Sequence, residues 1–351
     1  MLNVIMSHKI SLTPSTALLN PNKHLYLCRN TFFCLILMAA SPKHIAFGWY
    51  GGKYSHLDWL LPLLPAATHF CDVFGGSAAV LINRLPAPVE TYNDVDRELV
   101  NFFRVLRDQK VALLEAIGLT PFSREELARA CEPFELSTVS ELERARRFFV
   151  RARQVRTGLA QTASAGRWAH CLLTSRAGMA GAVSRWLGSH DDLAAIAQRL
   201  LRVQIENAPA IEVIERYDSP ETLFYCDPPY VHDTRGDSKA YAHEMTDADH
   251  RRLATVLHSV EGKVALSGYH GPLYEQLYKD WYQTEAPEKL CHSVKQTRRE
   301  VLWTNYDPKN ITAPLPLTDA NQWRLPAKSS TPLFEEPTKT YKRRKSVTTD
   351  K

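Results

Sequence analysis

The sequence lacks closely spaced pairs of cysteines, which argues against stabilisation of the fold by disulfides or by a structural zinc ion. Its seven cysteines are odd in number and widely scattered, and no two of them form a Cys-x-x-Cys pair. A disulfide framework and a structural zinc site are therefore not expected, and a reduced, cytoplasmic protein fits the pattern better. The thirteen histidines show no metal-ligand spacing either, so we expect no metal site.

The sequence also lacks an apolar run long enough to cross a membrane near its start. The run Thr31–Ala40 is shorter than the roughly 20 residues that a membrane span needs. With Lys23 and Arg29 upstream it could be a signal peptide, but nothing downstream has the character of a secreted protein. We therefore interpret residues 1–43 as a disordered extension outside the fold, with Met38 as the expected start, and expect no membrane association.

The overall composition sets broad limits and excludes little else. Of the 351 residues, 44% are hydrophobic and 23% are charged, which is ordinary for a globular protein. The net charge of +5 is modest and identifies no partner by itself. The length suits one large domain, or a core domain that carries an insert.

Two strand–helix units open the predicted fold. The apolar run His69–Phe74, the turn Gly75–Ser77 and the apolar stretch Ala78–Leu85 predict a strand, a tight turn and a helix. Val89–Tyr92 predicts a second strand, and residues 99–106 repeat apolar side chains at the spacing of an amphipathic helix. Two such units in a row indicate a parallel sheet with helices on its faces.

The strand–helix alternation stops in the middle of the chain and then resumes. Thr222–Cys226 and Lys263–Ser267 predict further strands, Thr246 begins a capped helix between them, and Arg299–Thr304 predicts a late strand. The predicted domains are a catalytic domain (residues 44–113 and 210–307), a helical insert without clear strands (114–209) and a disordered tail rich in Pro and Lys (308–351).

The strongest chemical signal is Asp227-Pro228-Pro229-Tyr230, directly after an apolar strand. Ligands of open α/β sheets bind outside the carboxyl ends of the strands. The prolines stiffen the loop and remove two backbone donors. The Asp227 carboxylate and the Pro228 carbonyl can then accept the two hydrogens of an amino group and aim its lone pair at a methyl donor, while Tyr230 offers a face for base stacking. The alternative is a proline-rich turn with an Asp cap.

A second signal lies in the loops after the first two strands. Phe74-Gly75-Gly76-Ser77 can bring the backbone close to a ligand, because glycine has no side chain to interfere. Asp94, at the end of the second strand, can accept hydrogen bonds from both hydroxyls of a ribose. The alternative for Asp94 is a helix N-cap, and one residue could serve both roles.

A stretch without Asp, Glu or Lys extends from Arg144 to His190. It contains nine arginines, with Trp168 and Trp186 between them. The planar fork of arginine suits phosphate and guanine recognition. A solvated face would mix charges of both signs, so the pattern favours a DNA-binding surface. The candidate DNA contacts are Arg147, Arg151, Arg153, Arg156 and Arg167.

These motifs and their order resemble the Dam-type DNA adenine methyltransferases of group alpha, and more closely the versions often carried by phages and prophages. The resemblance extends from Gly48 to Tyr306. The matching segments are the opening motif Trp49-Tyr50-Gly51-Gly52-Lys53, the cofactor loop Phe74–Ser77, the ribose-binding acid in Asn93-Asp94, the catalytic motif Asp227–Tyr230 and the late strand Arg299–Tyr306.

The resemblance implies a Rossmann-like α/β sheet with an inserted helical DNA-recognition subdomain. It implies methyl transfer from S-adenosyl-L-methionine to the N6 amino group of an adenine flipped out of double-stranded DNA. The implied cofactor contacts are Trp49, Lys53, Phe74, Gly75, Gly76, Asp94 and Asp227. We expect a monomer; the DNA sequence recognised, a cognate restriction enzyme, and a role in restriction–modification or as an orphan enzyme are left open.

The sequence departs from the family pattern in two places. The second glycine of the usual Phe-x-Gly-x-Gly loop is Ala78, whose methyl group is expected to crowd the cofactor, and the insert lacks a match to the GATC-recognition segment. Tyr241, His243 and Glu244 could shape the base pocket or lie in a surface loop. Two alternative functions stay open: methylation of another amino group (cytosine or a protein amide), and a catalytically inactive DNA-binding homologue.

Overall fold

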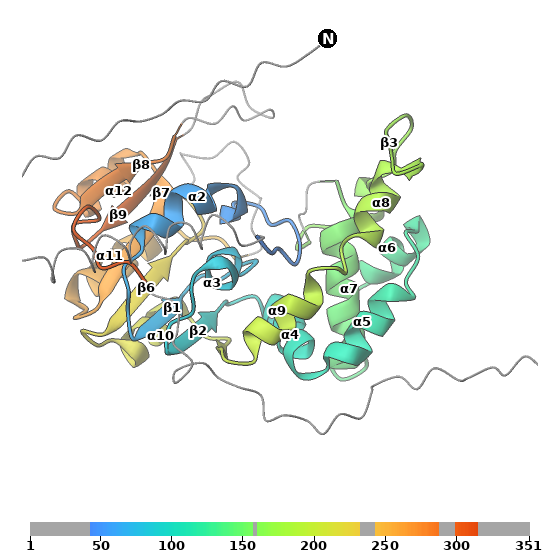
Figure 1. The fold of residues 1–351 in the computed structure, drawn as a ribbon, viewed down its shortest axis with the longest axis horizontal. Coiled ribbons are helices and arrows are strands. Elements are labelled where there is room, and N and C mark those ends of the chain that lie inside the picture. Colours follow the sequence, from blue (N-terminus) through green and yellow to red (C-terminus); the bar gives the residue numbers. More distant parts are fainter. Residues whose placement is uncertain (1–42, 157–159, 232–242, 288–298, 315–351) are drawn as a thin grey trace, which may run out of the picture. The chain divides into compact units, whose positions relative to one another are not determined.

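A computed structural model describes residues 43–156, 160–231, 243–287 and 299–314 (Figure 1). The predicted N-terminal extension lies outside these residues apart from Lys43, as do Tyr241 and residues 315–351 of the predicted tail. Residues 308–314 belong to the fold rather than to a tail. The Thr312 carbonyl accepts a hydrogen bond from the Ala66 amide at 2.7 Å, and Pro314 is buried.

A seven-stranded sheet in the order β5-β2-β1-β6-β7-β9-β8 forms the centre of the described fold. The strands are β1 (His69–Asp72), β2 (Val89–Asn93), β5 (Gln204–Glu206), β6 (Thr222–Cys226), β7 (Lys263–Tyr269), β8 (Tyr282–Glu285) and β9 (Glu300–Thr304). The first five strands of that order are parallel, and β9 runs antiparallel between β7 and β8. This topology confirms the predicted α/β class with a Rossmann-like sheet.

Two buried clusters cover the two faces of the sheet, because successive side chains of a strand point to opposite faces. Along β6, Leu223 and Tyr225 belong to one cluster, whereas Phe224 and Cys226 belong to the other. The first cluster includes residues of α2 (Leu57–Leu60), α3 (Ala79–Asn83) and α4 (Arg97–Asp108). The second includes residues of α10 (Ala210–Tyr217), α11 (Asp247–Ser259) and α12 (Pro272–Leu277).

The segment between β2 and β5 is mainly helical. Its helices after α4 are α5 (Lys110–Gly118), α6 (Arg124–Ala130), α7 (Glu141–Gln154), α8 (Gly181–Leu187) and α9 (Leu193–Leu200). The prediction of a region without strands is wrong in two respects. Residues 175–180 form the hairpin of β3 (Ser175–Arg176) and β4 (Met179–Ala180), and β5 joins the central sheet beside β2. Strands of two or three residues are too short to leave an alternating pattern in the sequence.

The helical region shares its core with the sheet domain instead of forming a core of its own. Phe102 of α4 stacks on Phe149 of α7 with 5.7 Å between ring centroids, and both side chains are fully buried. The same buried cluster continues into α9 through Ile196 and Leu200. The buried core is therefore continuous across residue 114, where the sequence predicted a domain boundary.

Candidate active site

Polar residues from four strands meet at one edge of the sheet. Asp72 ends β1, Asn93 ends β2, and Asp227 directly follows β6. Glu300 begins β9, and because β9 is antiparallel to β7, its amino end lies at the same edge as the carboxyl ends of the parallel strands. The chain order reverses between β1 and β6, since β2 and β5 lie on one side and β6 and β7 on the other. Ligands of open α/β sheets bind at such a switch point.

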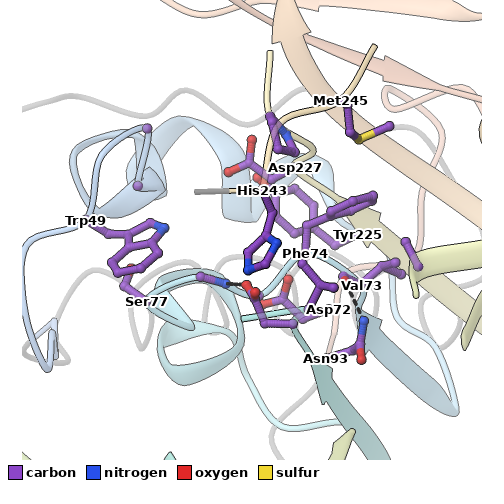
Figure 2. Close-up of a pocket in the computed structure, with 18 of the residues that line it drawn as sticks. Trp49, Asp72, Val73, Phe74, Ser77, Asn93, Tyr225, Asp227, His243 and Met245 are labelled. Atoms are coloured by element: carbon purple, nitrogen blue, oxygen red, sulfur yellow. Dashed lines mark hydrogen bonds between the residues drawn. The ribbon is translucent and has the colours of Figure 1, made fainter. Parts of the chain in front are cut away.

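A cavity of about 450 Å³ lies at this edge (Figure 2). Its volume is within the range of small-molecule sites. The cavity is lined by all seven predicted cofactor residues: Trp49, Lys53, Phe74, Gly75, Gly76, Asp94 and Asp227. His243 and Glu244 also line it, so these two do not belong to a remote surface loop. The structure thus brings together residues that are up to 204 positions apart in the sequence, from Trp49 to Leu253.

Asp94 is held in place by two backbone amides. The Gly76 N–H donates to Oδ2 at 2.9 Å, and the Asp96 N–H donates to Oδ1 at 2.8 Å. Burial raises the pKa of Asp94 to about 6, although both hydrogen bonds favour the carboxylate. The N-cap alternative is wrong, because Asp96 caps α4 by accepting from the amides of Glu98 and Leu99.

The two glycines of the cofactor loop are required by the packing of the protein's own side chains. A Cβ atom at Gly75 would lie 2.2 Å from the Tyr92 ring. Gly76 has a φ of +50°, and a Cβ atom there would lie 3.0 Å from the indole nitrogen of Trp49. The Tyr92 hydroxyl donates to the Gly76 carbonyl at 2.8 Å. The loop therefore passes closely between two aromatic rings, and Figure 2 shows Trp49 beside Ser77.

Ala78 departs from the glycine of related loops without obstructing the cavity. Its backbone is left-handed, with φ 56° and ψ 22°, a conformation that favours glycine. Its methyl group is fully buried in the core, and Ala78 is not among the described residues that line the cavity. The expectation that this methyl crowds the cofactor is therefore wrong. Alanine is instead unfavourable here because the backbone of residue 78 adopts a left-handed conformation.

The catalytic motif is tied to the opening motif by an ion pair. Both carboxylate oxygens of Asp227 lie 2.7 Å from the Lys53 ammonium nitrogen. Lys53 also donates to the Tyr230 hydroxyl at 2.7 Å and lies 3.3 Å from Glu300, and the Tyr230 hydroxyl donates to Glu300. Lys53, Tyr230 and Glu300 are at most 5% exposed, whereas the Asp227 side chain is 17% exposed and reaches the cavity.

The charges of this network control the protonation of its members. Burial raises the pKa of Asp227 to about 6; Lys53 opposes the rise, and the negative charge of Glu300 adds to it. Burial alone would lower the pKa of Lys53, but the attraction of Asp227 and Glu300 outweighs it and raises this pKa. At neutral pH the network therefore holds a carboxylate at Asp227 and an ammonium at Lys53.

Comparison with known proteins decides which chemistry this site belongs to. Residues 49–298 match the family described as D12 class N6 adenine-specific DNA methyltransferases. The protein belongs to this family. The Type II methyltransferase M1.LlaDCHI of Lactococcus lactis subsp. cremoris is 26% identical over 282 residues, which cover 74% of this chain and 94% of that protein. The predicted activity, methylation of adenine N6 in DNA, is thereby confirmed, and the family supports adenine over cytosine or a protein amide.

For an adenine methyltransferase, the place of Tyr230 differs from the prediction. Its ring is 4% exposed and packs edge-on against Tyr269, with 4.6 Å between the centroids. Pro229 lines the cavity, but Tyr230 and Pro228 are not among its described lining residues. The predicted stacking face is therefore covered in this structure, and the Tyr230 hydroxyl serves a buried hydrogen-bond network.

Asp72 is a cavity residue that was not predicted from the sequence. Its side chain is 1% exposed, and apart from the nearby Leu81 backbone N–H, which lies outside good hydrogen-bond geometry, its carboxylate oxygens face no donor in the described part of the chain. Burial, together with the charges of Asp227 and Asp94, raises its pKa well above the usual range. A buried polar group without a partner is rare in proteins, so a donor from a ligand is the natural complement. The available signal was an acidic residue at the carboxyl end of the first strand.

Three of the five predicted DNA-contact arginines are partly buried against the protein itself. Arg147 forms an ion pair with Glu143 at 2.9 Å, and Arg151 donates to the Ala130 carbonyl at 2.6 Å. Arg153 is half-buried, with its guanidinium 5.9 Å from the centre of the Phe149 ring. The other two are exposed to solvent: Arg156 lies 3.1 Å from Nδ1 of His170, and Arg167 donates to the Thr162 hydroxyl at 3.2 Å.

Several arginines of residues 144–190, a stretch that contains no Asp or Glu, find acidic partners elsewhere in the fold. Buried Arg144 pairs with Glu98 of α4, and Arg146 pairs with Glu126 of α6 at 2.9 Å. These carboxylates come from other elements or from the start of α7, outside the counted stretch. The inference that the whole run faces DNA is therefore wrong for these arginines, because the fold supplies the missing charges.

The hairpin β3–β4 is an exposed feature of the helical region, and it contacts α8 (Figure 1). Its turn residues Ala177 and Gly178 have φ values of 53° and 75°, as a type I′ turn requires. Leu172 and Leu173, which precede the hairpin, are 88% and 96% exposed. Two large apolar side chains so exposed mark a surface that suits a partner.

The described residues also bear on the predictions about metals, membranes and disulfides. Among them, no group of three or more His, Cys, Asp or Glu side chains is placed to hold a metal ion. None of the described helices is both long and apolar enough to span a bilayer. The four described cysteines, Cys71, Cys131, Cys171 and Cys226, are free thiols.

Proposed function

We propose that the protein uses S-adenosylmethionine to methylate the N6 amino group of adenine in double-stranded DNA, and that the cavity holds this cofactor. The observation that carries the proposal is the grouping of three carboxylates, Asp72, Asp94 and Asp227, around one cavity at the switch point of the sheet. When bound, the cofactor supplies a methyl group activated by a sulfonium.

The lining residues fit the parts of that cofactor. Asp94 suits the ribose, because a carboxylate at the end of the second strand can accept from both hydroxyls. Asp72 suits the ammonium group of the methionine part, because no described donor bonds its buried oxygens in good geometry and a cation there would offset the burial and the charges of Asp227 and Asp94 that raise its pKa. The apolar side chains of Val95 and Ile211, which also line the cavity, suit a purine ring.

Asp227 is the proposed acceptor for the target amine. Its carboxylate and the Pro228 carbonyl each accept one hydrogen of the amino group, which draws the nitrogen lone pair out of conjugation with the purine. These interactions strengthen as the nitrogen rehybridises, so they act mainly on the chemical step. The adenine must first leave the DNA helix, which costs a few kcal/mol.

We place the DNA-facing surface on the hairpin side of the helical region. Arg176 of the hairpin is exposed, as are Arg156 and Arg167, which precede the hairpin in the sequence, whereas Arg144 and Arg146 are paired with carboxylates. Exposed arginines bind phosphates by releasing condensed counterions, without first breaking an internal ion pair. The exposed Leu172 and Leu173, which lie between Arg167 and Arg176 in the sequence, add apolar surface to the same segment.

The proposal is tested by replacing the amine acceptor. Asp227→Ala should lower the single-turnover methylation rate by roughly 100- to 1,000-fold, the usual effect of losing one electrostatic group in a transition state. DNA binding should stay close to that of the parent. Asp280→Ala, which removes an exposed aspartate paired with His258, serves as the control. Mass spectrometry of nucleosides from the treated DNA identifies the product.

Each outcome of that experiment has a definite meaning. N6-methyladenine with the parent protein and with Asp280→Ala, but almost none with Asp227→Ala, supports the proposal. Methylcytosine in place of N6-methyladenine would show the wrong target base. No methylated nucleoside from the parent protein at any cofactor concentration would favour an inactive DNA-binding homologue.

A further inference from the structure

Glu300 is a buried carboxylate beside the catalytic motif, and the chemistry proposed for Asp227 leaves it without a role. It is the first residue of β9 and lies in register with Tyr269 of β7. Its side chain is 4% exposed, it accepts a hydrogen bond from Tyr230, and it lies 3.3 Å from the Lys53 ammonium. A buried carboxylate at the same sheet edge as the active site is costly to keep unless it is paired.

Lys53 presents a conflict that the catalytic step has to resolve. Its ammonium lies 2.7 Å from both oxygens of Asp227, and it is also held by the Gly51 carbonyl at 2.8 Å. The target amine needs an oxygen of Asp227 as its acceptor. Lys53 occupies only one lone pair on each Asp227 oxygen, but its positive charge weakens the acceptor that the amine needs. Asp227 becomes a stronger acceptor when the ammonium shifts toward another anion, whereas an ammonium buried without any anion is strongly unfavourable.

We infer that Glu300 is a positioning residue for methyl transfer, acting as the second anionic partner of Lys53 when the target amine takes the Asp227 carboxylate. The inference rests on the proposed role of Asp227 as the amine acceptor. Glu300 already lies 3.3 Å from the ammonium, so Lys53 can exchange one carboxylate for the other without leaving the site. The Tyr230 hydroxyl, hydrogen-bonded to both Lys53 and Glu300, bridges the two positions.

The charge of Glu300 also acts on Asp227 directly. Because this negative charge adds to the rise in the Asp227 pKa, its removal should lower that pKa and extend activity to lower pH. The other titratable groups that face the network are Asp72 of β1, Lys53, Tyr225 of β6, Tyr230, Tyr269 of β7 and Tyr274 of α12. These residues stay unchanged when Glu300 alone is replaced, so a shift in the pH profile reports on Glu300.

The test is Glu300→Gln, which keeps the size of the side chain and an acceptor for Tyr230 but removes the charge. The single-turnover methylation rate at neutral pH should fall roughly 10- to 100-fold. This is at or below the usual contribution of a general acid or base, because Glu300 acts through Lys53 and does not contact the substrate. The midpoint of the acid limb of the rate profile should move to lower pH by about one unit. Cofactor and DNA affinities should stay within about threefold of the parent, because such a change affects transition-state stabilisation and not ground-state binding.

Two further variants separate charge from structure. Glu300→Asp keeps the charge and should leave the acid limb at the pH of the parent. Glu285→Gln removes an exposed glutamate of β8 that pairs with Arg299, and should change neither the rate nor the pH profile. If Glu300→Gln does not fold, Glu300→Asp decides alone. A shifted acid limb of its pH–rate profile would contradict the inference, and an unshifted acid limb with a reduced rate would support it.

The inference and the proposed function fail in different ways. The proposed function fails if the parent protein makes no N6-methyladenine. The inference fails if the parent does make it and Glu300→Gln has the same rate and the same acid limb. A reduced rate of Glu300→Gln with an unmoved acid limb would also overturn the inference, because it would indicate a purely structural role.

Discussion

The proposed ribose contact makes Asp94→Asn the most informative change in the cofactor site. Each Asp94 oxygen already accepts one backbone N–H, from Gly76 at 2.9 Å or from Asp96 at 2.8 Å, and each has a second lone pair for a ribose hydroxyl. Asparagine replaces one of these oxygens with an NH2 group. That group would face a backbone donor, so one hydrogen bond to the ribose would disappear and one amide would be left without an acceptor.

The size of the effect follows from the kind of bond. A hydrogen bond to a charged group contributes about 1.5–3 kcal/mol, which corresponds to a roughly 10- to 150-fold increase in the Kd for S-adenosylmethionine. Asp94→Ala removes both hydrogen bonds to the ribose and should weaken binding further. It also leaves the amides of Gly76 and Asp96 without acceptors, so it should lower the free energy of unfolding by about 1–3 kcal/mol.

Titration calorimetry between pH 5 and 8 measures this effect. Because burial raises the pKa of Asp94 to about 6, the carboxylate that accepts from the ribose is lost as the pH falls through about 6, and cofactor affinity should fall with it. This step should become smaller in Asp94→Asn, where any remaining pH dependence belongs to Asp72 and to Asp227, which lines the same cavity and whose pKa is also raised to about 6. Asp58→Asn, which changes an exposed aspartate paired with Lys43, is the control. An unaltered Kd in Asp94→Asn, or an unaltered step near pH 6, would refute the assignment.

Two further predictions concern the cofactor loop and the DNA surface. Gly75→Ala should lower the free energy of unfolding by about 1–3 kcal/mol in a denaturant titration, because the new Cβ atom would meet the Tyr92 ring at 2.2 Å. Gly118→Ala, where nothing lies within 4 Å, should not destabilise the protein, and equal effects of the two changes would contradict the packing argument. Joint replacement of Arg156, Arg167 and Arg176 by Ala should weaken DNA binding and reduce its salt slope by about 0.9 for each phosphate that is no longer neutralised, as measured by fluorescence anisotropy. Arg146→Ala should leave that slope unchanged, because Arg146 is paired with Glu126. A reduced slope in this variant would show that the ion-paired arginines also bind DNA.

The parts of the site that could be predicted from the sequence are those fixed by local chain geometry. Asp94 and Asp227 directly follow strands that the sequence predicted, and the carboxyl ends of parallel strands meet at one edge whatever the rest of the fold does. The glycines of the cofactor loop were recognisable for a related reason, since a tight turn after a strand selects them. Their exact cause, the packing of Gly75 against Tyr92, depends on a side chain from the next strand and could not be foreseen.

The parts that could not be predicted depend on contacts between distant segments. The arginines alone do not reveal that Arg144 meets Glu98, which lies 46 positions away on another helix. The ring of Tyr230 likewise looks available for stacking until Tyr269 of the neighbouring strand covers it. In both cases the residue type was interpreted correctly for its chemistry, but its partner was supplied by the tertiary fold.

The direction of β9 explains why Glu300 escaped notice and why it matters. In a wholly parallel sheet, the first residue of a strand lies at the edge opposite to the ligand, so an acid at a strand start would not be sought as a site residue. Because β9 is antiparallel to β7, its first residue lies at the catalytic edge, in register with Tyr269. The reversal places a second carboxylate within 3.3 Å of the ammonium that binds Asp227. An ammonium between two carboxylates is held less exclusively by either of them, and this is the condition under which the Asp227 carboxylate can be released to an incoming amine.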